Sequence, residues 1–227
     1  MAGGAQRQLV LDLGHSESYA REDFIRGTSN AAGLTLIERW PDWPDRAVVV
    51  TGPQGAGKSH LAAIWAEQAG ARAVAAAALR DADLPDLLTG GALVVDDLDP
   101  DTGFDERVLF HLLNLVREEN AFLLMTSRTL PAAWTLSIAD LASRLRALPV
   151  VALALPDEKL LRALLMKLAA DRQIVLDDSV VNYLLVRIER SFAGVQSAVV
   201  RLDHAAMQQK RPVTRALAAE LFRDGVE

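Results

Sequence analysis

The sequence predicts an α/β protein in which a parallel sheet covered by helices on both faces precedes a small all-helical domain. As far as Leu155, short continuous apolar runs alternate with segments of helical periodicity, which is typical of buried parallel strands connected by helices. After Pro156 every segment has helical periodicity and no strand pattern follows. A glycine-rich turn directly after the first apolar run is the third observation, because phosphate-binding loops lie at that position.

At 227 residues, the chain is long enough for one mid-sized domain and a smaller one. We expect residues 1–18 to be a flexible tail, residues 19–155 to form the α/β core, and residues 156–227 to form the helical lid.

The core elements follow from capping residues, apolar runs and helical periodicity. Ser29 and Asn30 are good N-caps for a first helix over Ala31–Arg39, and the first strand is predicted at Ala47–Thr51. Later strands are predicted at Ala71–Ala78, Ala92–Val95, Ala121–Met125 and Val150–Leu155. Helices between them are predicted at Leu61–Ala69, Phe104–Glu118 and Ile138–Leu145. The lid helices are predicted at Asp157–Arg172, Asp178–Glu189, Phe192–Gln208 and Thr214–Arg223.

The composition narrows the function classes. A net charge of −6 disfavours a protein whose main task is to hold duplex DNA, since such proteins carry a basic patch or domain. The absence of cysteine excludes disulfides and thiolate metal sites. No apolar run approaches a membrane span, and no signal-peptide pattern begins the chain. We therefore expect a soluble, cytoplasmic protein with no membrane partner.

The glycine-rich turn at Gly52–Ser59 fits the pattern of Gly, four residues, then Gly-Lys-Ser. Its glycines let the backbone N–H groups wrap around a polyphosphate, and the following helix adds a favourable field. Lys58 can then reach the terminal phosphates, and the Ser59 hydroxyl can bind Mg²⁺. The loop predicts a bound nucleotide, ATP or ADP, with contacts from Pro53, Gln54, Gly55, Ala56, Gly57, Lys58 and Ser59.

Polar side chains end two of the other predicted strands. Asp96 and Asp97 follow an apolar run, where Asp96 suits a water-mediated Mg²⁺ ligand and Asp97 an acid that orients the attacking water. Thr126 and Ser127 end the next strand and are expected to face the terminal phosphate. Each pattern by itself is also typical of a solvated strand end.

Several motifs resemble, in their order, the AAA+ ATPases of the DnaA replication-initiator clade. They are Phe24–Asn30, the Gly52–Ser59 loop, Asp96-Asp97, Thr126-Ser127 and Asp140–Leu145. Within that clade, the Leu141–Arg144 and Leu155–Leu160 segments are most similar to the Hda family of DnaA-related regulators. The resemblance covers nearly the whole chain from Tyr19.

The resemblance implies roles for single residues. Phe24 and Ile25 would line the adenine pocket, and Thr126 and Ser127 match the position called sensor 1. Arg144 matches the arginine finger, a catalytic residue that reaches a neighbouring subunit's nucleotide. By itself, Arg144 is equally typical of a cation on a helix surface.

Two positions depart from the clade. Arg128 stands where Asp is common, and Ala193 falls where a lid arginine, sensor 2, is expected to reach the phosphates. Arg190, about one turn earlier, is the remaining candidate for that cation. Without that cation, we expect either weak intrinsic hydrolysis or a preference for ADP; the sequence leaves open which of ATP and ADP is the working ligand.

The tail carries a second short motif. Gln8-Leu9-Val10-Leu11-Asp12-Leu13 resembles the peptide by which bacterial proteins dock on the DNA polymerase sliding clamp, its β subunit. In that mode Gln8, Leu9, Leu11 and Leu13 would make the contacts. The same alternation is typical of an edge strand.

Together these features lead to a hypothesis with two alternatives. The first is a clamp-docked regulator that stimulates hydrolysis of DnaA-bound ATP, a negative regulator of initiation that contacts DNA only indirectly. The sequence ends where the lid is expected to end, at Glu227, before any helix-turn-helix domain such as the initiator carries. The alternatives are a DnaA-like adaptor or helicase loader, and a self-contained P-loop enzyme. Self-association stays open.

Overall fold

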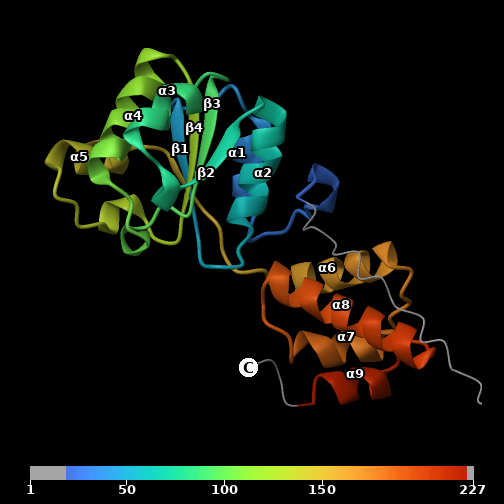
Figure 1. Cartoon of the computed structure of the whole chain (residues 1–227). Coiled ribbons are helices and arrows are strands. Elements are labelled where there is room, and N and C mark those ends of the chain that lie inside the picture. Colours follow the sequence, from blue (N-terminus) through green and yellow to red (C-terminus); the bar gives the residue numbers. More distant parts are fainter. Residues whose placement is uncertain (1–18, 224–227) are drawn as a thin grey trace, which may run out of the picture.

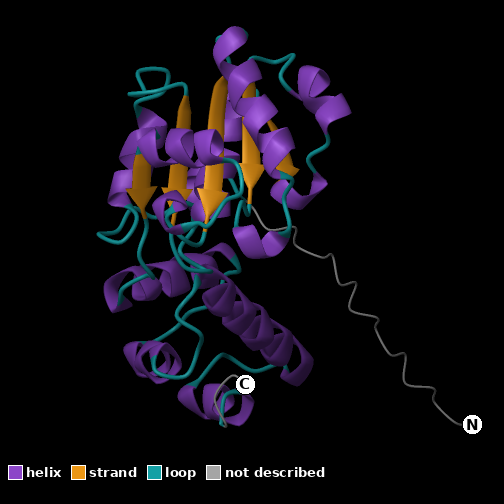
Figure 2. Cartoon of the chain, turned by 90° about the vertical axis from the view of Figure 1, so that its left-hand side faces the viewer, coloured by secondary structure: helices purple, strands orange, loops and turns teal. Residues whose placement is uncertain are grey.

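The computed structural model describes residues 19–223. Its centre is a five-stranded sheet in the order β2-β3-β4-β1-β5. Every paired neighbour in the sheet is parallel. The strands are β1 (Ala47–Thr51), β2 (Arg72–Ala75), β3 (Ala92–Asp96), β4 (Phe122–Ser127) and β5 (Val150–Ala152). Because all strands run in one direction, their carboxyl ends meet at one edge of the sheet, and in Figure 2 that edge faces the helices of the lid.

Helices cover both faces of the sheet, and a separate group of helices follows it in the chain (Figure 1). The core helices are α1 (Ala31–Glu38), α2 (Lys58–Ala69), α3 (Leu84–Leu87), α4 (Glu106–Glu118) and α5 (Ala139–Ala147). The lid helices are α6 (Glu158–Asp171), α7 (Asp178–Leu185), α8 (Phe192–Gln209) and α9 (Arg215–Leu221). Short 3-10 turns connect them, including η1 (Arg21–Asp23), η2 (Ala76–Ala78), η3 (Asp81–Asp83), η4 (Pro100–Thr102) and η5 (Pro131–Ala133).

Side chains of strand β1 pack against the helices on both faces of the sheet. Successive side chains of a strand point to opposite faces: Ala47 and Val49 pack with the cluster under α4, whereas Val48 and Val50 pack with the cluster under α1 and α2. All five residues of β1 are buried. The strand that leads into the glycine loop is therefore fixed from both sides.

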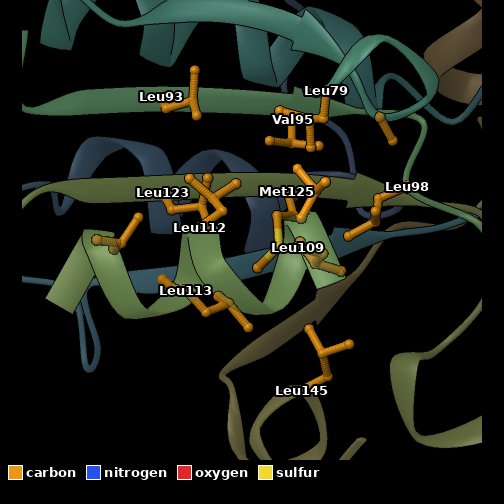
Figure 3. Packing of buried hydrophobic residues seen from close by; sticks show 14 of the residues in the cluster. Leu79, Leu93, Val95, Leu98, Leu109, Leu112, Leu113, Leu123, Met125 and Leu145 are labelled. Carbon is orange, nitrogen blue, oxygen red and sulfur yellow. The ribbon is translucent and has the colours of Figure 1, made fainter. Parts of the chain in front are cut away.

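Helix α4 covers its face of the sheet with one apolar stripe. Val108, Leu109, Leu112, Leu113 and Val116 are buried at the spacing of a single helical face. Leu109 and Leu112 lie beside Met125 and Leu123 of β4 in Figure 3. The helix begins after Asp105, whose carboxylate accepts hydrogen bonds from the first turn.

The lid has its own apolar cluster, formed by α6 to α9. Its buried members include Leu165, Val181, Val199 and Phe222. Ile25, from the segment before α1, packs against this cluster and so connects it to the core. No helix within residues 19–223 is both long and apolar enough to cross a membrane.

The fold class predicted from the sequence is confirmed, and the differences lie at element ends. Helix α2 begins at Lys58, three residues before the predicted Leu61, because the phosphate-loop turn leads directly into its first turn. The predicted strand at Ala71–Ala78 shortens to β2 and continues as η2. β5 likewise ends at Ala152, although the Leu153 N–H still bonds to the Thr51 carbonyl at 2.7 Å.

Candidate functional site

A cavity of about 410 Å³ lies where the core meets the lid. One wall is the loop Gln54–Ser59, and another is the segment containing Phe24 and Ile25. Leu160, Leu164 and Phe192 of the lid close the apolar side, and Asp96, Asp97, Thr126 and Arg128 form the polar end. The cavity therefore has an apolar part and a charged part.

The loop has the geometry that an anion site needs. Gly55 and Gly57 have φ angles of +78° and +94°, a region where glycine is at ease and other residues are strained. Helix α2 starts at Lys58 with no side chain capping its first turn, so its N–H groups are free to bind an anion. These features fit the phosphates of a nucleotide.

Lys58 turns its ammonium back onto its own loop. The Nζ atom donates to the Gly52 carbonyl at 2.8 Å and to the Pro53 carbonyl at 3.0 Å. Burial lowers the pKa of Lys58, while the nearby carboxylates of Asp96, Asp99 and Asp97 oppose that shift. Because a hydrogen bond to a charged phosphate oxygen is stronger than one to a neutral carbonyl, this partly buried ammonium should exchange one carbonyl for a phosphate when a nucleotide binds.

The polar end fits a magnesium ion. The Ser59 hydroxyl donates to Asp96 at 3.0 Å, and the Thr126 hydroxyl donates to the same carboxylate. Mg²⁺ in proteins is commonly held by one or two such oxygens together with substrate phosphates. In the described part of the chain, no three His, Asp or Glu side chains cluster as a metal centre, so Ser59 and Asp96 would share the ion with phosphate oxygens.

Asp97 faces the same end of the cavity in an unusual backbone conformation. Its φ is +56°, and its N–H donates to the Thr126 hydroxyl at 2.9 Å. Its carboxylate pairs with Arg128, whose Nη2 lies 3.3 Å from both carboxylate oxygens. The acid expected to orient a water is therefore paired with a cation of its own chain.

Ser127 does not reach the cavity, contrary to its expected place beside the terminal phosphate. It is buried, and its hydroxyl donates to Asp99 at 2.9 Å and to the Thr129 carbonyl at 2.7 Å. The cause is the alternation of β4, which turns Thr126 toward Asp96 and Ser127 to the other side. Pro53 contributes its carbonyl to Lys58 but does not line the cavity.

The apolar part is built around His60, the residue after Ser59. Its ring meets Phe24 and Phe192 edge-on, with centroid separations of 5.1 and 5.8 Å. Burial lowers the pKa of His60, which favours the neutral ring. Phe24 and Ile25, for which the resemblance implies adenine contacts, line this cavity. The other apolar residues of its wall were not identified from the sequence: His60, Leu160, Leu164 and Phe192.

The lid brings no cation into the described walls of this cavity. Ala193 lines it, as expected for the departure at that position, and Arg190 does not. Arg128 from the end of β4 does line it. The sequence signal for Arg128 is its departure from the family pattern. The direction of the Arg128 side chain, however, depends on how the loop after β4 folds.

Arg144 lies at the other end of the sheet. It lines a second cavity, of about 950 Å³, together with Arg46 and Phe122, which adjoin the amino ends of β1 and β4. Its Nη1 donates to the Asn114 side-chain oxygen at 2.5 Å, and its guanidinium lies 4.8 Å from the centre of the Phe110 ring. Arg144 thus belongs to a different surface from Lys58. Gln8, Leu9, Leu11 and Leu13 lie outside the described residues.

Comparisons with solved structures establish the fold class. Domain III of DnaA from Thermotoga maritima matches with a TM-score of 0.75 at 20% identity, over 93% of this chain and 98% of that one. The RuvB branch-migration motor of Thermotoga maritima matches with a TM-score of 0.73 at 17% identity, over 91% and 72%. AMPPCP-bound DnaA from Aquifex aeolicus matches with a TM-score of 0.69 at 18% identity, over 85% and 67%. The protein has an AAA+ fold with a helical lid.

Sequence comparisons narrow this class. Residues 157–220 match the family model described as "Hda, lid domain". DnaA of Lactobacillus delbrueckii is 26% identical over 96% of this chain and 53% of its own length. DnaA of Thermomicrobium roseum is 25% identical over 98% and 54%. Nearly the whole chain is therefore similar to DnaA, and its lid is similar to that of Hda; the chain spans about half the length of the curated relatives it matches.

Proposed function

We propose that this protein is a nucleotide-binding regulator of chromosomal replication initiation. Docked on the DNA polymerase sliding clamp, it stimulates hydrolysis of the ATP bound to DnaA and so acts negatively on initiation. The observation that carries the proposal is the place of Arg144, an ordered cation remote from the chain's own phosphate loop. The Hda-type lid at 157–220 and the relationship to DnaA support it.

The contacts of Arg144 suit a residue that is held ready for a partner. Asn114 and Phe110 on α4 orient the guanidinium. The third contact is an ion pair with Asp140 at 3.2 Å, in which the two side chains are 36% and 61% exposed. Exposed pairs of this spacing contribute about 0.3–0.5 kcal/mol. Arg144 can therefore leave Asp140 for a phosphate at small cost.

The chemistry assigned to Arg144 is stabilisation of charge on the partner's nucleotide. Water attacks the γ-phosphorus of DnaA-bound ATP, a new P–O bond forms, and the bond to the β–γ bridging oxygen breaks. The products are ADP and inorganic phosphate, and the proton of the attacking water leaves to solvent or a base of the DnaA site. The guanidinium neutralises negative charge that grows on the leaving and transferring oxygens.

The chain's own cavity would hold ATP or ADP with Mg²⁺ and link lid to core. Lys58 and the first turn of α2 would bind the phosphates, Ser59 and Asp96 the ion, and Phe24 and Ile25 the base. The bound nucleotide would contact both the phosphate loop and the lid. AMPPCP-bound DnaA from Aquifex aeolicus has a related fold, which supports this assignment.

The clamp contact is assigned to Gln8, Leu9, Leu11 and Leu13. A short extended peptide of this kind binds through one polar and a few apolar side chains.

The direct test measures hydrolysis of DnaA-bound ATP with and without DNA-loaded clamp. Arg144→Ala should reduce the stimulated rate by about 10³-fold, the range in which arginine fingers contribute. Arg146→Ala, on the same helix and exposed, is the matched control and should keep the stimulation. A double variant, Gln8→Ala with Leu11→Ala, should lose the dependence on clamp. Undiminished stimulation by Arg144→Ala, or stimulation independent of clamp in the wild type, would contradict the proposal.

A further inference from the structure

Arg128 is placed at the metal-binding end of the nucleotide cavity. It follows the last residue of β4, and its Nη2 lies 3.3 Å from both oxygens of Asp97. Asp97 adjoins Asp96, which accepts a hydrogen bond from Ser59 at 3.0 Å. In a P-loop site, the hydroxyl and acid that share Mg²⁺ lie beside the terminal phosphates. Arg128 is therefore on the γ-phosphate side of the cavity.

Two positively charged side chains line the described part of this cavity. Among the residues described around this cavity, Lys58 and Arg128 are the side chains with a permanent positive charge. Lys58 reaches the phosphates from the loop side, where a phosphate oxygen can replace one of its two carbonyl partners, and Ala193 offers the cavity only a methyl group. Beyond Lys58, a third negative phosphate has Arg128 as the remaining cation among the described residues of the lining.

The backbone of Arg128 is fixed although its side chain is exposed. Asp99, which is buried, accepts from the Arg128 N–H at 2.9 Å and from the Thr129 hydroxyl at 3.1 Å. The Arg128 side chain remains 51% exposed. Asp99 thus sets the point from which the guanidinium reaches into the cavity.

The pair between Arg128 and Asp97 is weak enough to exchange. Its side chains are 51% and 47% exposed, and solvent-exposed ion pairs typically contribute about 0–1 kcal/mol. A guanidinium can bind phosphate oxygens through two parallel N–H bonds, which is a stronger and more directional contact. A terminal phosphate can therefore displace Asp97 from Arg128 at little cost.

We propose that Arg128 is a specificity-determining residue that makes this cavity favour a nucleoside triphosphate over a diphosphate. With a diphosphate, Arg128 pairs with Asp97. With a triphosphate, its guanidinium binds the terminal phosphate, in the role that Ala193 cannot fill. This inference rests on the part of the proposed function that makes the cavity a nucleotide site, and it is independent of any action on DnaA.

The first test is titration calorimetry of the whole chain with Mg²⁺ and either AMPPCP or ADP. Arg128→Ala should weaken AMPPCP binding by about tenfold, as expected for one charge-assisted contact. ADP affinity should stay within about twofold, since a diphosphate lacks the group that Arg128 binds. Arg190→Ala, a lid cation outside the cavity, is the matched control and should change neither affinity. Equal losses for both nucleotides, or no loss, would overturn the proposal.

The second test separates direct contact from mere cancellation of the Asp97 charge. If Arg128 acted only by neutralising Asp97, adding Asp97→Asn to Arg128→Ala would restore AMPPCP affinity, and that result would overturn the proposal. Direct contact predicts that the double variant stays weak. Arg128→Lys should recover part of the affinity because it keeps the charge without the guanidinium fork.

A third readout needs no change in affinity. The Nε–Hε resonance of Arg128, assigned by comparison with Arg128→Lys, should shift on adding AMPPCP with Mg²⁺ and stay in place with ADP. An unchanged resonance with AMPPCP would count against the contact. All three measurements use the isolated protein, so they can succeed even if stimulation of DnaA fails, and the reverse also holds.

Discussion

Lys167 on α6 and Asp23 in η1 form an ion pair of 2.5 Å that joins the lid to the segment before α1. The same ammonium also binds Asp171, at 3.0 Å. The Lys167 and Asp23 side chains are only 28% and 18% exposed, so this pair is less screened than the surface pairs elsewhere in the chain. It lies beside the apolar wall of the nucleotide cavity, since Asp23 also lines that cavity.

Removing this pair should loosen the lid. Lys167→Met should lower the free energy of unfolding by about 1 kcal/mol, the usual size for a partly buried charged hydrogen bond after discounting for solvent. The hydrogen bond that Lys167 donates to Asp23 raises the pKa of Lys167 above its ordinary 10.5. The stabilisation is then complete below pH 10.5 and disappears as pH rises through the folded pKa.

Urea unfolding of wild type and Lys167→Met at neutral and strongly alkaline pH checks both statements. Lys159→Met, on the exposed side of the same helix, is the control and should cost less. A difference between wild type and Lys167→Met that persists unchanged above the folded pKa would show that the lysine acts through packing instead.

Asp157 should make the lid junction sensitive to acid. Its carboxylate accepts from the Thr28 hydroxyl at 2.7 Å and from the Leu160 N–H at 2.7 Å, so it both caps α6 and bonds to the core. These bonds, the Thr28 one foremost, lower the pKa of Asp157 from its ordinary 3.8. Their stabilisation is present above pH 3.8 and is lost as pH falls through the lower folded value.

Thr28→Val tests the larger of these two contributions. The variant should have a lower thermal midpoint than wild type at neutral pH, and the two curves should converge in strong acid. Thr89→Val is a control, because the exposed Thr89 hydroxyl donates to the Pro85 carbonyl, which does not titrate. Parallel curves across the whole pH range would contradict the assignment.

Gly55 should tolerate no side chain because the lid comes close to it. A Cβ at this position would lie 2.5 Å from the Ser191 Cβ, and its φ is +78°. Gly55→Ala should cost about 1–3 kcal/mol of stability from backbone strain and should weaken AMPPCP and ADP alike by displacing the loop or α8.

Gly103→Ala separates strain from collision. Gly103 has a nearly equal φ of +76°, with nothing within 4 Å of its would-be Cβ. It should show a similar backbone penalty with unchanged nucleotide affinity by calorimetry. If both variants bind nucleotide equally well, the close approach of Ser191 to Gly55 does not affect nucleotide binding.

Asp99 should be a stability residue. It is buried and accepts from Ser127, Arg128 and Thr129. Asp99→Ala leaves several of these donors without a partner, and it should lower the unfolding free energy by about 2–4 kcal/mol. Asp101→Ala, two residues on and exposed, should stay within about 0.5 kcal/mol in the same urea titration. Equal effects of the two would refute the buried-acceptor role.

The phosphate loop and the sheet could be predicted because their signals are local. The geometry of Gly52–Ser59 follows from its glycines and from the helix that begins within it. Strand β1 is a continuous apolar run, the pattern of a strand that is covered by helices on both faces. Helix α4 follows from its spacing of leucines.

The rest depends on contacts between distant segments. Ser127 was expected in the cavity, but its direction follows from the register of β4 against β3 and from Asp99, 28 residues earlier. Arg128 could be noticed only as a departure, because its reach depends on that same carboxylate. The separation of Arg144 from Lys58 follows from α5 returning to the amino ends of the strands, which the order of elements alone does not give.

That separation has a consequence for assembly. Lys58 and Arg144 lie on different surfaces, so any complex in which one molecule's arginine meets its neighbour's nucleotide is head-to-tail rather than self-complementary. Rows built this way have two unlike ends. Under the proposed function, one regulator acts on the initiator next to it, at one end of such a row. The number of regulators needed would then follow the number of row ends, and not the number of initiators.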